Sequence, residues 1–144
     1  MEAREFRIGN YLEYFIQDNL DKRKEWWEMS KIDATDISLI ESGVDENYRP
    51  IRITEEILLR LGFKKYIDSE NVEDSEKMFG DYGFFSENTR TKIQVIISNE
   101  SVFTLVQFNI GMGYNLLVSN PPEYVHELQN LYFALTGQEL TLQP

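Results

Sequence analysis

The sequence lacks cysteine altogether. This absence excludes disulfide bonds, thiolate nucleophiles and every zinc or iron–sulfur site that depends on cysteine ligands. The chain also contains a single histidine, His126. A metal site would therefore need carboxylate ligands, which favour hard cations such as Ca²⁺ or Mg²⁺.

The acidic segment 68–81 is where such a cation would bind, but its spacing does not match an EF-hand loop. Counted from Asp68, the sixth place is Glu73 where the loop requires glycine, and the twelfth is Phe79 where it requires glutamate. We predict a solvated loop at this position. The sequence predicts no cofactor and no resident metal ion.

Long apolar runs are also missing. No stretch approaches the roughly 18 residues that a membrane-spanning helix requires. The N-terminal segment Met1–Gly9 has no apolar signal core and carries an acid from its second residue. We therefore expect a cytoplasmic protein that makes no contact with membranes.

Basic residues are scarce: 14 Lys and Arg stand against 25 Asp and Glu, for a formal net charge of −11. Residues 1–50 and residues 51–144 are each acidic. Direct binding to nucleic acid is disfavoured, because each phosphate contact needs a local positive charge. An acidic surface keeps a protein soluble, and it can also engage a basic partner or imitate DNA, as in some phage inhibitors.

The residues that are present indicate a folded α+β protein. The 144 residues are 42% hydrophobic and 13% aromatic, which is enough for one domain or two small lobes. Three apolar segments, 11–16, 26–32 and 36–41, predict a small curved β unit or an SH3-like barrel, with a charged tip at 18–25. The turn-forming residues of Gly43–Pro50 predict a boundary, with an N-terminal β unit over 1–47 and an α+β unit over 48–144, packed as one compact body.

The second unit is predicted to contain a short helix followed by an antiparallel meander. Thr54 is a good N-terminal cap, and Gly62 suits the C-terminal cap. The predicted strands are Phe63–Ile67, Tyr82–Ser86, Lys92–Ser98, Val102–Phe108 and Tyr114–Val118.

A C-terminal helix is the most strongly marked element. Asn120 is placed to cap it, with Pro121 at the first helical position, Glu123 closing a capping box and Gly137 at its end. One stripe of this helix is apolar and is predicted to pack on the sheet: Tyr124, Val125, Leu128, Leu131, Tyr132 and Leu135.

A second side of this helix is a candidate interaction surface, for another protein or for a second copy of the chain. It carries His126, Gln129, Asn130 and Phe133. Catalysis by His126 would need an orienting carboxylate and a nucleophile within reach, whereas its neighbours three and four positions on are amides. The adjacent pair Trp26 and Trp27 is a second candidate, because alternation along a strand places one indole on each face of a sheet.

Three segments resemble a known family: Glu5–Asn10, Tyr48–Phe63 and Tyr124–Leu140. They are similar to short uncharacterised proteins encoded by phages, prophages and mobile elements of anaerobic gut bacteria. The resemblance covers both ends and the middle of the chain, and residues 17–47 and 64–118 carry no matching motif. It implies a cytoplasmic accessory protein of a mobile element, and it implies no activity, ligand or catalytic residue.

These observations lead to three hypotheses about function. The first is a non-enzymatic interaction module that binds an unknown protein partner. The alternative is an acidic inhibitor or DNA mimic that blocks a nucleic-acid-binding protein. The third is a small-ligand enzyme without a recognisable motif, which would need a concave pocket with convergent polar groups.

Overall fold

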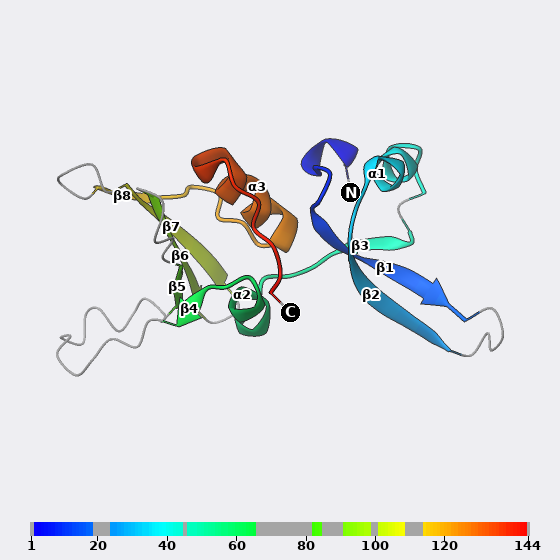
Figure 1. Ribbon diagram of the computed structural model, residues 1–144, viewed down its shortest axis with the longest axis horizontal. Coiled ribbons are helices and arrows are strands. Elements are labelled where there is room, and N and C mark those ends of the chain that lie inside the picture. Colours follow the sequence, from blue (N-terminus) through cyan, green and yellow to red (C-terminus); the bar gives the residue numbers. More distant parts are fainter. Residues whose placement is uncertain are drawn as a thin grey trace. The chain divides into compact units, whose positions relative to one another are not determined.

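The computed structural model describes residues 2–18, 24–44, 46–65, 82–84, 91–98, 101–108 and 114–143. The described residues form both helices and strands in an α+β arrangement, as predicted (Figure 1). The chain divides into two compact units. The first unit comprises Met1–Arg52 and Tyr124–Asn130, and the second comprises Ile53–Glu123 and Leu131–Pro144.

The first unit is built on a three-stranded antiparallel sheet in the order β2-β1-β3. Its elements are the 3-10 helix η1 (Ala3–Glu5), β1 (Tyr11–Gln17), β2 (Glu25–Lys31), α1 (Ala34–Glu41) and β3 (Tyr48–Pro50). The predicted hairpin is confirmed, because β1 pairs with β2 from Tyr11 opposite Lys31 to Gln17 opposite Glu25. Most of the predicted charged tip, residues 19–23, lies outside the described residues. The SH3-like barrel stays a prediction.

Helix α1 corrects one prediction, because residues 36–41 form a helix and not a third strand. The side chain of Asp33 accepts hydrogen bonds from the backbone N–H groups of Thr35 and Asp36, at 2.7 and 3.1 Å. The Asp36 carboxylate accepts in turn from the N–H of Asp33, at 2.8 Å. This capping box starts a helix at residues whose apolar run favoured a strand. The two backbone hydrogen bonds also lower the pKa of Asp33.

The core of the first unit lies between α1, η1 and the sheet. Phe6, Leu12, Ile32 and Ile40 are buried together, and Ala3, Ile37 and Tyr48 pack against them. The isoleucines of α1 therefore contribute to the core from a helix instead of the predicted strand. A helix of eight residues can supply this face because Ile37 and Ile40 are three positions apart.

The observed boundary of the first unit differs from the predicted division after residue 47. Strand β3 pairs with β1, with Pro50 opposite Leu12 and Tyr48 opposite Tyr14. The last residues of the turn-rich segment Gly43–Pro50 therefore complete the first sheet. Turn-forming residues mark a reversal of the chain, and this reversal connects α1 to β3 within one unit.

The second unit contains helix α2 (Glu55–Arg60), which has both predicted caps. The Thr54 hydroxyl accepts a hydrogen bond from the N–H of Ile57 at 3.3 Å. At the other end Gly62 has a φ of +83°, which is the left-handed conformation that glycine adopts most easily. The N–H of Phe63 reaches the carbonyl of Leu58 at 2.9 Å, which completes a Schellman motif.

The predicted meander is confirmed as a five-stranded antiparallel sheet in the order β4-β5-β6-β7-β8. Its strands are β4 (Lys64–Lys65), β5 (Tyr82–Phe84), β6 (Thr91–Ser98), β7 (Ser101–Phe108) and β8 (Tyr114–Leu117). Ile93 and Val95, which alternate with Gln94 in β6, are buried. The acidic segment 68–81 lies outside the described residues.

Helix α3 (Val125–Thr136) begins later than predicted. The residues before it bond to the segment around Arg52 instead: the N–H of Val125 donates to the carbonyl of Ile51 at 2.9 Å, and Tyr124 forms an isolated antiparallel β-bridge with Arg52. Extended pairing of this kind is incompatible with a helix that starts at Pro121. The actual capping contact runs from the Tyr124 N–H to the Glu127 carboxylate, at 3.1 Å.

The end of α3 and its apolar stripe agree with the prediction. Gly137 has a φ of +70°, and its N–H donates to the carbonyl of Phe133 at 2.8 Å. Val125, Leu128 and Tyr132 are buried. The packing of α3 on the meander stays a prediction. Within the described ranges, no helix has the length and apolarity to cross a membrane.

Candidate binding pocket on the first unit

Two of the predicted interaction residues on α3 are buried, so the expectation that this side is open to a partner is wrong for them. His126 is 3% exposed and Gln129 is 1% exposed. The Gln129 side chain accepts a hydrogen bond from the N–H of Tyr11 at 2.9 Å and donates to the carbonyl of Gly9 at 3.4 Å. The amide therefore holds the start of β1 inside the first unit.

Asn130 has the same internal role. Its side-chain oxygen accepts from the Asn10 amide at 3.2 Å and from the Arg7 guanidinium at 3.4 Å, and its nitrogen donates to the carbonyl of Glu5 at 2.9 Å. The amides of α3 thus clamp the turn formed by residues 7–10. Of the four residues proposed on this side, Phe133 is the most exposed, at 38%.

The His126 ring has two aromatic neighbours. Its centroid lies 4.6 Å from the ring centroid of Phe6 and 5.9 Å from that of Tyr124. Its Nδ1 atom is buried and has no hydrogen-bond partner in the described part of the chain. Burial lowers the pKa of His126, and the negative charges of Glu127 and Glu5 oppose this only in part. The side chain is therefore packed as a neutral ring.

We expect acid to destabilise the first unit through His126. An unfolded histidine becomes protonated near pH 6.5, whereas the buried ring resists protonation until a lower pH. The unfolded state then binds more protons, so the free energy of unfolding falls as pH decreases from about 6.5 toward the lower folded pKa. The slope is at most about 1.4 kcal/mol per pH unit for one proton.

Urea unfolding of the wild type and of His126→Phe at pH 7.5, 6.5 and 5.5 tests this. Both tryptophans of the chain lie in β2, so their fluorescence reports on the first unit. His126 is the only histidine, and carboxylates titrate near pH 4. The free energy of unfolding of His126→Phe should not fall between pH 6.5 and 5.5 as it does in the wild type. An equal fall in the free energy of unfolding of both proteins would contradict the assignment of His126 as a buried neutral ring.

Trp26 and Trp27 point to opposite faces of the first sheet, as predicted. Trp27 is half-buried: its ring lies 5.4 Å from that of Phe15, and the Arg49 guanidinium lies 4.2 Å above it. Arg49 also forms an ion pair with Glu13 on the same face. Trp26 lies on the other face and is 44% exposed. Trp26 is therefore the more exposed of the two tryptophans.

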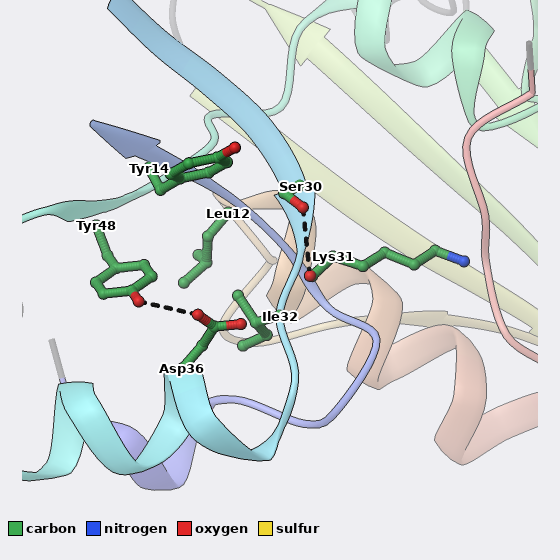
Figure 2. Close-up of a pocket in the computed structure, with 7 residues that line it drawn as sticks. All are labelled: Leu12, Tyr14, Ser30, Lys31, Ile32, Asp36 and Tyr48. Atoms are coloured by element: carbon green, nitrogen blue, oxygen red, sulfur yellow. Dashed lines mark hydrogen bonds between the residues drawn. The ribbon is translucent and has the colours of Figure 1, made fainter. Parts of the chain in front are cut away.

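The face that carries Trp26 also contains a pocket beside α1, which we call the Tyr48 pocket (Figure 2). Its volume is about 140 Å³. It is lined by Leu12, Tyr14, Ser30, Lys31, Ile32, Asp36 and Tyr48. Strand pairing explains the shared face, because Ser30 lies opposite Leu12 and Tyr48 lies opposite Tyr14.

The polar end of the Tyr48 pocket is a phenol hydrogen-bonded to a carboxylate. The Tyr48 hydroxyl donates to Asp36 Oδ1 at 2.9 Å. Burial, together with the neighbouring Asp36 and Asp33 carboxylates, raises the pKa of Tyr48 to about 12. The phenol is therefore protonated at neutral pH, which suits hydrogen bonding better than proton abstraction.

Lys31 contributes little positive charge to the pocket. Figure 2 shows its side chain directed away from Tyr48 and Asp36. Its ammonium group lies over the ring of Tyr11, 5.5 Å from the centroid, on the opposite face of the sheet. The Asp36 carboxylate is therefore the charged side-chain group that the lining presents inside the pocket.

The sequence interpretation missed the Tyr48 pocket. Its residues come from β1, β2, α1, β3 and the segment after β2, so no short motif contains them. The available local signal was the pair Asp33 and Asp36, whose spacing is typical of a capping box. Reading that pair as the start of a helix would have placed Asp36 in its first turn, without showing that this turn packs beside the sheet.

The described residues bring together no group of three or more His, Asp or Glu side chains that could hold a metal ion. Comparison of the chain with protein-family models, curated proteins and solved structures found no match.

Proposed function

We propose that this protein is a non-enzymatic interaction module that binds another protein through the Trp26 face of the first sheet. The observation that supports this most directly is the 44% exposure of Trp26 on the face that also contains the Tyr48 pocket. Tryptophan buries a large area on binding and is enriched among the residues that dominate binding energy.

The register of the sheet supports a continuous surface between these two features. Ile16 lies opposite Trp26, and Tyr14 lies opposite Glu28 one step nearer the pocket. Ile16 and Tyr14 are both partly exposed, so apolar and aromatic area extends from the indole to the pocket. Aromatic side chains are enriched in protein interfaces relative to the rest of the protein surface.

The chemistry of the pocket favours binding over catalysis. Its hydrogen-bonded phenol has a raised pKa, so at neutral pH it neither attacks nor removes a proton readily. The volume of about 140 Å³ is also well below the roughly 300 Å³ at which ligand pockets begin. These two properties support a non-enzymatic function. The cellular setting that we propose, a phage or mobile element, comes from the resemblance of the three sequence segments.

Affinity capture from cells that carry the encoding element, followed by mass spectrometry, would test this proposal. Trp26→Ala should weaken the binding of a captured partner by at least about 2 kcal/mol, which is a roughly thirtyfold increase in Kd. Leu59→Ala is a matched control, because Leu59 is 47% exposed and lies on α2 of the second unit. It should leave binding unchanged.

Equal retention of partners by the two variants would contradict an interface at Trp26. A complex that consists only of second copies of the chain, lost with Trp26→Ala, would instead make this face a dimer surface. Capture of a nucleic-acid-binding protein that duplex DNA displaces, with steep weakening by salt, would favour an acidic inhibitor.

A further inference from the structure

We infer that the Tyr48 pocket receives a lysine side chain of the protein partner. The inference depends on the proposed function, because it assigns a chemistry to the surface on which Trp26 lies. The pocket combines an apolar floor, two phenol rings and one carboxylate in a volume of about 140 Å³. Each of these three features matches one part of an extended lysine side chain.

Size limits the occupant to a single side chain. An engineered apolar cavity of about 150 Å³ accommodates benzene, which is similar in bulk to the methylenes and ammonium group of lysine. Leu12 and Ile32 are 1% and 4% exposed, and they form apolar walls against which methylene groups can pack. Lysine readily buries its aliphatic stem while its charge stays at a polar site.

Charge complementarity selects a cation. The Asp36 carboxylate borders the pocket, while the Lys31 ammonium group points away from it (Figure 2). The rings of Tyr14 and Tyr48 add two aromatic groups, and an ammonium ion close to such rings is attracted by their negative faces. Glu28, which lies opposite Tyr14 on the same face, and the net charge of −11 attract basic segments toward this surface.

The hydrogen bonds already made by Asp36 favour lysine over arginine. Asp36 Oδ1 accepts from the Tyr48 hydroxyl, and Oδ2 accepts from the Asp33 N–H. A guanidinium fork needs both oxygens in one plane at the same time. An ammonium group needs only one remaining lone pair, and the Ser30 hydroxyl lies in the same lining as a further acceptor.

NMR titration of the ¹⁵N-labelled full chain with Nα-acetyl-lysine methylamide tests the inference. The norleucine analogue has a similar apolar side chain without the charge, and the arginine analogue tests the shape of the cation. We expect the lysine probe to shift the amide signals of Ser30, Ile32 and Asp36 and to bind about tenfold more tightly than either comparator. No localised shift up to about 50 mM probe, or equal shifts with norleucine, would overturn the inference.

Two variants test whether the lysine probe binds in the Tyr48 pocket. Asp36→Asn should weaken the lysine probe about tenfold, whereas Glu41→Gln removes the same charge from an exposed position on the same helix and should not. Because Asp36 also caps α1, Ser30→Leu serves as a second variant. It fills the pocket from an exposed strand position and leaves the cap intact. Unchanged probe binding by Ser30→Leu would overturn the inference.

Binding of a captured partner by the three variants distinguishes a failure of this inference from a failure of the proposed function. A partner lost with Trp26→Ala but fully retained by Ser30→Leu and Asp36→Asn would leave the interaction module in place and exclude a lysine in the pocket. Binding of the lysine probe by a chain whose partners are unaffected by Trp26→Ala would support the pocket chemistry and contradict the proposed interface.

Discussion

Replacing Gln129 by leucine is expected to lower the free energy of unfolding of the first unit by about 3 kcal/mol. Leucine has a similar volume but cannot bond to the N–H of Tyr11 or the carbonyl of Gly9. Both Gln129 and Tyr11 are at most 9% exposed, so water cannot replace the lost partner without a rearrangement. Urea unfolding followed by tryptophan fluorescence measures the change.

Gln17→Leu is the matched control for this prediction. Gln17 is exposed, and its amide bonds to the Glu25 carboxylate at 2.8 Å on the surface. The same substitution there should change stability by less than about 1 kcal/mol. If Gln129→Leu proved as mild as Gln17→Leu, the buried amide would not be holding β1 to α3.

Replacing Leu12 by alanine should destabilise the first unit by about 3 kcal/mol, within the range of 2–5 kcal/mol typical of buried leucines. Leu12 is 1% exposed and belongs to the cluster that contains Phe6, Ile32 and Ile40. The substitution removes apolar contacts and leaves space that the neighbouring strands fill only in part. It should also enlarge the Tyr48 pocket, because Leu12 forms part of its lining.

The control for this substitution is Leu39→Ala. Leu39 lies on α1 and is 39% exposed, and alanine is a good helix former. The expected change is within about 0.5 kcal/mol. The measurement is again the unfolding midpoint with its slope in urea. Equal losses for the two leucines would contradict the position of Leu12 at the centre of the core.

Much of the fold could be predicted because its signals are local. The hairpin of β1 and β2 follows from two aromatic and β-branched segments on either side of charged residues. Helix α2 follows from Thr54 and Gly62, whose cap bonds involve residues fewer than six positions apart. The alternation of Ile93 and Val95 with Gln94 likewise indicates a strand, and both apolar residues are buried. In each case, neighbouring residues contain the whole signal.

The two misread helix starts show where local signals compete. At α1, a capping box centred on Asp33 opposed the strand preference of an isoleucine-rich run, and the capping box prevailed. At α3, good capping residues at Asn120 and Pro121 were not used, because the following residues pair with Ile51. Capping residues therefore start a helix only where the backbone around them does not pair with another segment.

The candidate site could not have been predicted in the same way. The Tyr48 pocket depends on the register that places Tyr48 opposite Tyr14 and on the packing of α1 against that face. A shift of one residue in either strand pairing would turn these side chains to the other face. The tryptophans illustrate the same point, because the sequence placed them on opposite faces without indicating which face stays open.

The sequence by itself determined the composition limits, the absence of cysteine chemistry, the α+β class and the caps of α2, since these depend on residue types and short spacings. Only the tertiary structure decided that His126, Gln129 and Asn130 face inward. Their hydrogen-bonding partners, and the Phe6 ring beside His126, lie between Glu5 and Tyr11, about 120 positions away in the chain. A helix reveals its polar side by periodicity, but the element that covers that side comes from elsewhere in the chain, and burial depends on that element.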